Sequence, residues 1–284
     1  MSMSTAAIRR RPVRVLLLVA AIAASVYALL PLAWAAVGAF RPESDIFRFM
    51  DPLSWQSFVP VPFTFDNVRT VLESSFPLAL GNSLLVTVLT VVIGLAVCIP
   101  AAFALSALEF RGRNVVFAVI LVSFLIPFDS IAIPLSSTFR TLQLQDSFLG
   151  ILLPGIANGL AIFQLRQFFL SIPAELKEAA RIDGLGWFGI MRRVYMPLAT
   201  PAIIGAALLL FVFQWQSYLW PLLVAPDPQF VLAPIAIANY AGEHSVAYGA
   251  IFLAGIVTAL VPLAVLLFTQ RYFTASIATT GSKG

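Results

Sequence analysis

The chain has 284 residues, of which 60% are hydrophobic and 11% are charged, and its formal net charge is +4. A soluble globular domain carries about 25% charged residues, so the composition excludes an ordinary soluble fold and favours helices that cross a lipid bilayer. The single cysteine, Cys98, and the single histidine, His244, exclude a disulfide framework and a Cys/His metal cluster.

Sequence motifs for ATP hydrolysis and for other hydrolytic chemistry are absent. No phosphate-binding loop of the form G-x-x-x-x-G-K-[ST] occurs, so the chain is not itself a P-loop ATPase. The hydrolase patterns G-x-S-x-G and H-E-x-x-H do not occur either. We therefore expect no catalytic residue, no metal and no cofactor of the chain's own.

Six long apolar runs predict an all-α integral membrane protein with six transmembrane helices. The first run follows four arginines, and it is longer than the roughly 7–15 apolar residues of a secretory signal peptide, so we expect it to be retained. The six predicted spans are Val15–Phe40, Leu80–Leu108, Val115–Leu135, Phe148–Leu170, Leu198–Val224 and Tyr248–Thr269.

The distribution of Lys and Arg predicts that both termini lie in the cytoplasm. With that orientation 13 of the 17 basic residues face the cytoplasm, and the other four (Arg41, Arg48, Arg69 and Arg140) lie outside. Cytoplasmic segments of membrane proteins carry such an excess, which accounts for the positive charge without a nucleic-acid partner. The predicted organisation is a cytoplasmic tail (1–14), a six-span domain (15–270) with a cytoplasmic charged segment (173–197), and a second cytoplasmic tail (271–284).

The charged segment predicts a short helix, Ala174–Asp183, on the membrane surface. Pro173 suits the first turn of a helix, and Gly184 predicts a stop in the left-handed conformation. Five charges from Glu175 to Asp183 would cost on the order of 12–17 kcal/mol at the bilayer centre, so the helix stays outside the membrane.

The side chains of this helix leave two uses open. Glu178 and Arg181 lie three residues apart and can pair. Leu176, Ala179, Ala180 and Asp183 fall on one side and form a mostly small, apolar face. The mixed charges argue against a helix that lies on anionic lipid. The residues alone leave a solvated loop and a docking site for a soluble partner equally open.

The spacing in this segment resembles a known signature. Glu178-Ala179-Ala180, three residues, Gly184, nine residues and then Val194-Tyr195-Met196-Pro197 resemble the E-A-A-x3-G-x9-I-x-L-P pattern of permeases in binding-protein-dependent ABC importers. The likeness extends over nearly all of Asn82–Gly284, and it points to the smaller, six-span subunit of maltose-transporter-type carbohydrate permeases.

The resemblance implies partners and a role for the charged segment. The partners are a second permease subunit, two cytoplasmic ATPase subunits that bind the ATP, an extracytoplasmic solute-binding protein and the lipid of a bacterial inner membrane. The segment becomes a coupling helix that docks on an ATPase subunit. The coupling residues implied are Glu175, Glu178, Ala179, Ala180, Arg181, Asp183, Gly184 and Pro197.

Polar residues within the predicted spans are candidates for the solute pathway. In the fifth span Gln214, Ser217 and Tyr218 recur at helical spacing, so we expect them to share a face that could contact a sugar; bonding between helices is the alternative. Asp129 and Asn158 are further candidates. The permease family that this chain resembles usually has an acidic residue where this chain has Ser217. Any role of that acidic residue therefore cannot be assigned to this chain.

Two other functions remain open at this stage. A permease for glycerol phosphate esters would share the whole signature, although no Lys or Arg falls in the middle of a predicted span. A proton-coupled secondary transporter would also have many spans and a buried acid, but it would need no coupling helix.

Overall fold

The computed structural model describes residues 5–242 and 246–280, and the regular structure within these ranges is helical throughout. The predicted all-α class is confirmed. The environment of side chains is described for 15–242 and 246–271. His244 and nearly all of the two predicted tails (1–14 and 271–284) lie outside those residues. The chain divides into two compact units, residues 1–74 with 237–259 and residues 75–236 with 260–284.

The first unit joins a long helix to a short-helical segment and to the start of the last helix. Its elements are α1 (Thr5–Ala39), η1 (Glu43–Asp45), η2 (Trp55–Phe58), α2 (Asp66–Glu73) and the first part of α14 (Tyr248–Thr280). The Glu43 carboxylate accepts hydrogen bonds from the backbone N–H of Tyr248 at 2.8 Å and of Gly249 at 3.0 Å. A carboxylate at this position satisfies unpaired N–H groups and complements the helix dipole, so Glu43 stabilises the start of α14.

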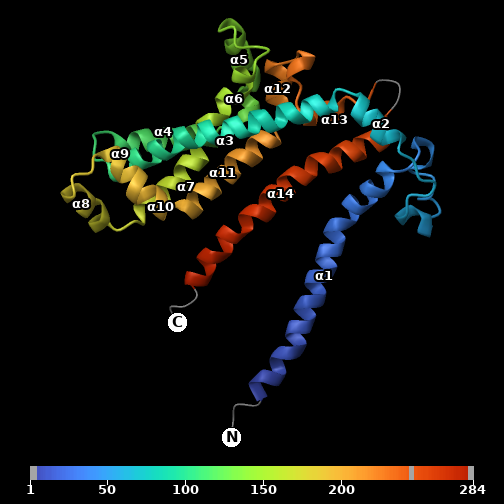
Figure 1. Cartoon of the computed structure of the whole chain (residues 1–284), viewed down its shortest axis with the longest axis horizontal. Coiled ribbons are helices and arrows are strands. Elements are labelled where there is room, and N and C mark those ends of the chain that lie inside the picture. Colours follow the sequence, from blue (N-terminus) through green and yellow to red (C-terminus); the bar gives the residue numbers. More distant parts are fainter. Residues whose placement is uncertain (1–4, 243–245, 281–284) are drawn as a thin grey trace. The chain divides into compact units, whose positions relative to one another are not determined.

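The second unit is a helical bundle around α3. Its elements are α3 (Phe76–Ala107), α4 (Arg113–Leu125), α5 (Phe128–Thr141), α6 (Phe148–Ile156), α7 (Gly159–Leu170), α8 (Ala174–Ile182), α9 (Trp187–Ile190), the π-helical η3 (Met191–Tyr195), α10 (Met196–Leu198), α11 (Thr200–Trp215), α12 (Leu219–Val224), η4 (Pro228–Phe230) and α13 (Ala233–Ala238). Helices α3, α7 and α11 run side by side (Figure 1).

Two apolar clusters fill this bundle. The larger one joins α3, α7 and α11 with η3 and contains Cys98, Leu165, Tyr195 and Leu210. The other joins α3 and α6 with α5 and α12, where the Trp220 indole N–H donates to the Gly150 carbonyl at 3.1 Å. Helix α8 lies beside α9 at one end of this unit, and α5 and α12 lie beside each other, away from α8 (Figure 1).

Small residues let helices approach the fourth predicted span closely. A Cβ on Gly155 would stand 3.2 Å from the Thr90 side chain, and a Cβ on Gly159 would stand 2.9 Å from that of Phe124. These distances are closer than a Cβ ordinarily keeps, so α3 packs tightly at Gly155 and α4 at Gly159. The close contacts at Gly155 and Gly159 are both made within the chain.

The membrane spans are less regular than the sequence predicts. Four helices are long and apolar enough to cross a bilayer alone, and the number rises to six if each of two bent pairs counts as one span. The predicted span Val115–Leu135 is broken in the structure, because α4 and α5 meet at 98°. Pro127 causes this break: it forces Ile126 to the extended backbone observed there, with φ −71° and ψ 121°.

Candidate functional site

Helix α8 ends as its sequence predicts. Gly184 N donates to the Arg181 carbonyl at 3.0 Å, and Leu185 N donates to the Ala180 carbonyl at 3.0 Å. This pair of hydrogen bonds is a Schellman motif, in which the residue after the helix takes a left-handed conformation, and Gly184 has φ +80°. The predicted glycine stop is confirmed.

The requirement for glycine at this turn comes from the backbone alone. No heavy atom lies within 4 Å of the position that a Cβ on Gly184 would occupy, so a side chain would meet no obstacle there. Its positive φ, however, is costly for any residue with a Cβ. Gly186 is equally open but has φ −70°, which every L residue tolerates.

Ala180 lies on the inner side of α8, because the turn at Gly184 folds the following residues back against the helix. Ala180 is 6% exposed and belongs to the same apolar core as Ile190. The predicted small outward face is therefore wrong for Ala180, although Ala179 is exposed. The outward apolar side chain is Ile182, which is 87% exposed and lies about 200° around the helix from Ala180. Sequence reasoning missed Ile182 because helical spacing does not reveal which side of a short helix meets its own chain.

The charged side chains of α8 point to solvent. Glu175, Glu178 and Asp183 are all exposed. The predicted pair between Glu178 and Arg181 does not form: the Arg181 guanidinium lies 5.0 Å from the ring centroid of Trp187 instead. This cation–π contact fastens α8 to α9 at its surface. The outer side of α8 thus presents one large apolar side chain among acidic groups.

Pro197 lies at the end of the signature segment, just before α11. It stands in the first turn of α10, directly after the π-helical turn, in which Met196 N donates to the Met191 carbonyl. The helical stretch Trp187–Leu198 then meets α11 at 87°. A π turn and a proline are both recognised causes of helix kinks, so the last residues of the signature set the direction from which α11 begins. The predicted fifth span, Leu198–Val224, begins at this bend, since Leu198 is the last residue of α10.

The candidate pathway residues of the fifth span do not share a helical face, and that prediction is wrong. Helix α11 ends at Trp215, so Ser217 and Tyr218 lie in a non-helical link before α12. Gln214, at the end of α11, is buried; its Oε1 accepts a hydrogen bond from the Thr90 hydroxyl at 3.2 Å, and its Nε2 has no partner in the described part of the chain. Gln214 therefore links two helices, whereas Tyr218 is exposed.

Asp129 and Asn158 each stand at the start of a helix. Asp129 lies in the first turn of α5 and is exposed in the chain. The Asn158 side chain accepts a hydrogen bond from Ala161 N at 3.0 Å, which makes it the N-cap of α7. This N-cap hydrogen bond is a structural role that explains why a polar residue stands at position 158.

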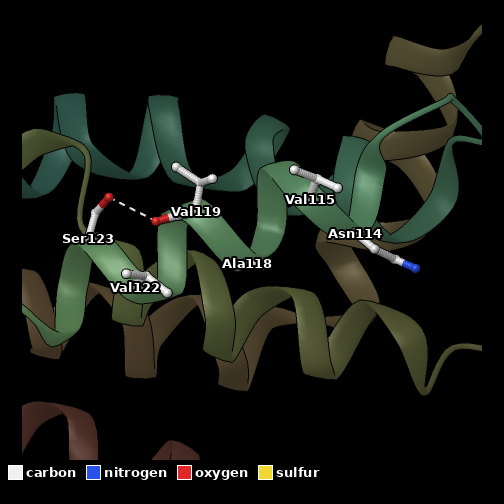
Figure 2. A pocket seen from close by; sticks show the side chains of 6 residues that line it. All are labelled: Asn114, Val115, Ala118, Val119, Val122 and Ser123. Atoms are coloured by element: carbon white, nitrogen blue, oxygen red, sulfur yellow. Dashed lines mark hydrogen bonds between the residues drawn. The ribbon is translucent and has the colours of Figure 1, made fainter.

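A shallow hollow of about 440 Å³ lies along α4 (Figure 2). Its lining is Asn114, Val115, Ala118, Val119, Val122 and Ser123. Figure 2 shows the Ser123 hydroxyl turned to the Val119 carbonyl of its own helix, to which it donates at 2.8 Å. The hollow therefore offers a sugar almost no free polar group. Among the described residues, no group of three or more His, Cys, Asp or Glu side chains could hold a metal ion.

Comparisons with known proteins agree with this architecture. The family described as the binding-protein-dependent transport system inner membrane component matches residues 94–279. An arabinooligosaccharides transport system permease protein, AraQ of Halalkalibacterium halodurans, is 33% identical over 90% of this chain and 92% of its own length. An sn-glycerol-3-phosphate transport system permease protein, UgpE of Brucella melitensis, is 31% identical over 76% of this chain and 77% of its own. The crystal structure of a bacterial ABC transporter involved in the import of alginate contains a chain with a TM-score of 0.76, at 25% identity and over 93% of this chain and 98% of that one.

Proposed function

The chain belongs to the family of binding-protein-dependent transport system inner membrane components, and from this premise we propose that it is the permease subunit of an ATP-driven carbohydrate importer. The observation that carries the proposal is the segment that begins at α8. It has the full spacing of the signature, its helix is closed by the left-handed Gly184, and it turns Ile182 away from the chain's own core.

Coupling to ATP hydrolysis follows from the exposed side of α8. An exposed isoleucine flanked by small and acidic residues suits a hydrophobic pocket in a soluble partner, and buried apolar anchors dominate the energy of such interfaces. The carboxylates of Glu175, Glu178 and Asp183 would contribute more to the orientation of the docked helix than to its binding affinity. Ala180 and Gly184 act differently: they hold α8 in place and so position Ile182. We assign the partner as one of two cytoplasmic ATPase subunits, which supply the bound ATP.

A neutral carbohydrate fits the membrane region better than a phosphate ester does. The buried arginine of the second unit, Arg166, is already engaged: its Nε donates to the Leu105 carbonyl at 3.0 Å, and its guanidinium lies 3.9 Å from the ring centroid of Phe117. A doubly charged phosphate would need an available cation in a low-dielectric passage. AraQ, similar over most of its length, is named for arabinooligosaccharides. Carbohydrate import is accordingly the function proposed, and phosphate-ester import is the second candidate.

The assembly that this function needs comprises a second permease subunit, the two ATPase subunits and an extracytoplasmic solute-binding protein. Both termini and α8 face the cytoplasm in this arrangement, with six spans of which the third and fifth are bent. A cysteine at Gly186 in a Cys98→Ala background tests the orientation. It should resist a membrane-impermeant thiol reagent in intact cells, whereas a cysteine at Thr70 should react. Labelling of a cysteine at Gly186 in intact cells would show that this segment lies outside the cytoplasm and would contradict the proposed topology.

Docking is tested through Ile182. Ile182→Ala should reduce co-purification of the ATPase subunit while membrane insertion is unchanged, because no span is altered. Ile133→Ala is the matched control, since Ile133 is 71% exposed but belongs to α5. The substrate class is tested separately by competition: unlabelled oligosaccharides should inhibit uptake, and glycerol phosphate should not. Inhibition by glycerol phosphate alone would favour the second candidate.

A further inference from the structure

An uncharged, aromatic stretch in the first unit is exposed to an unusual degree. The stretch Leu53–Phe65, with the sequence LSWQSFVPVPFTF, contains no Asp, Glu, Lys or Arg. Its large apolar side chains are 40–68% exposed: Leu53, Trp55, Phe58, Val59, Val61, Phe63 and Phe65. Contiguous exposed apolar surface of this kind marks a contact with lipid or with another protein.

Three polar side chains beside this stretch point inward, although the flanking Asp51 and Asp66 are exposed. Arg41 is fully buried, and its Nη2 donates to the Val59 carbonyl at 2.7 Å. The Ser57 hydroxyl donates to the Phe49 carbonyl, so this buried side chain is also satisfied within the unit. Asn67 donates to the Arg41 carbonyl at 2.7 Å. A loop in water would place such groups outward and its aromatic side chains inward, so the observed arrangement suits an apolar environment.

The stretch is fastened to the outer end of the first predicted span. Helix α1 ends at Ala39, and Thr64 N donates to the carbonyl of the next residue, Phe40, at 2.9 Å. The Phe40 and Phe63 rings stack with centroids 5.5 Å apart, and Phe65 meets the Phe63 ring edge-to-face at 4.9 Å. This aromatic cluster therefore lies at the level where a membrane-spanning helix leaves the bilayer, the depth at which aromatic residues are enriched.

We propose that Leu53–Phe65 lies in the lipid–water interface, with Trp55 and Phe58 inserted among the lipid headgroups and upper acyl chains. It serves as an interfacial anchor for the end of α1. Docking of the solute-binding protein is disfavoured because such an interface carries complementary charges and a polar rim, and this stretch has no charge. The anchor depends on the chain being a membrane protein but on neither its solute nor its ATPase partner.

The measurement is a depth determination in the assembled importer, reconstituted in vesicles of phosphatidylethanolamine and phosphatidylglycerol. Trp55→Cys and Phe58→Cys, each in the Cys98→Ala background, carry a nitroxide spin label. Thr70→Cys is the matched control, since Thr70 is exposed on α2, on the same helix side as the exposed Arg69–Glu73 ion pair. Collision rates are measured with oxygen, which concentrates in lipid, and with a neutral nickel chelate, which stays in water.

The ratio of oxygen to nickel accessibility should be several-fold higher at Trp55 and Phe58 than at Thr70, with or without the solute-binding protein. Equal ratios at all three positions would overturn the proposal, because the stretch would then be in water. Nickel access at Trp55 and Phe58 that is lost only on addition of the binding protein would overturn it as well, since the stretch would then be a docking site. Uptake measured on the same vesicles reports the proposed transport function independently of either result.

Discussion

Replacing Gly184 with alanine isolates the contribution of one backbone angle to coupling. Because no atom lies within 4 Å of the new Cβ, the substitution creates no clash and removes no contact. What remains is the cost of φ +80° for an L residue, about 1–2 kcal/mol. If the turn relaxes to avoid that cost, the population of α8 in its docking geometry falls about 5–30-fold relative to the relaxed form.

The apparent affinity of the membrane complex for the ATPase subunit should fall by up to the same factor, since only the competent geometry binds. The assay is titration of the purified ATPase subunit onto reconstituted permease, read together with solute-stimulated ATP hydrolysis. Gly186→Ala is the matched control and should bind normally, because Gly186 is equally open but has negative φ. Gly184→Asn should have an intermediate effect, because asparagine tolerates the left-handed region better than alanine does. Equal affinities for Gly184→Ala and Gly186→Ala would refute the reasoning.

The other predictions concern packing and hydrogen bonds. Ala180→Leu should overpack the inner side of α8 and destabilise the fold by about 1–3 kcal/mol, whereas Ile182→Ala should leave the melting temperature unchanged; equal melting temperatures for the two variants would contradict the side assigned to each residue. A double-mutant cycle of Thr90→Val and Gln214→Leu should give a coupling energy of about 0.6 kcal/mol for their buried hydrogen bond, and a coupling of zero would mean that the bond is not formed. Glu43→Ala should destabilise the start of α14 by about 0.5–2 kcal/mol and speed hydrogen exchange of the first amides of that helix; unchanged exchange would exclude the capping contact.

The local structure of the coupling segment was predictable because its signals are local. Pro173 and Gly184 act through steric restrictions on their own backbone, and these operate whatever surrounds them. The bounds of α8 and its left-handed stop therefore follow from the sequence. The side on which Ala180 packs does not, because it depends on how the chain returns against the helix after Gly184. Ala180 and Ile182 are both apolar, so the sequence alone does not show which of the two is buried against the chain and which is exposed.

Two breaks within the predicted spans have signals in the sequence. The break between α4 and α5 follows from Pro127 by the same restriction that places a boundary before Pro173. The link between α11 and α12 fits Pro221, which lacks the N–H that would bond to the Ser217 carbonyl in a continuous helix. Burial of Gln214 is different, because its partner Thr90 lies on another helix and no spacing rule relates the two.

The central claim is that the chain imports a carbohydrate, and that α8 couples this transport to ATP hydrolysis by the ATPase subunit. Uptake of labelled oligosaccharide into vesicles that contain the full assembly tests it most directly, with ATP and a proton gradient supplied separately. The account predicts that uptake requires ATP on the side that carries α8, persists when the proton gradient is collapsed, and is reduced in Ile182→Ala and Gly184→Ala. Uptake driven by an imposed proton gradient without ATP, and unchanged in both variants, would contradict the account and identify a secondary transporter.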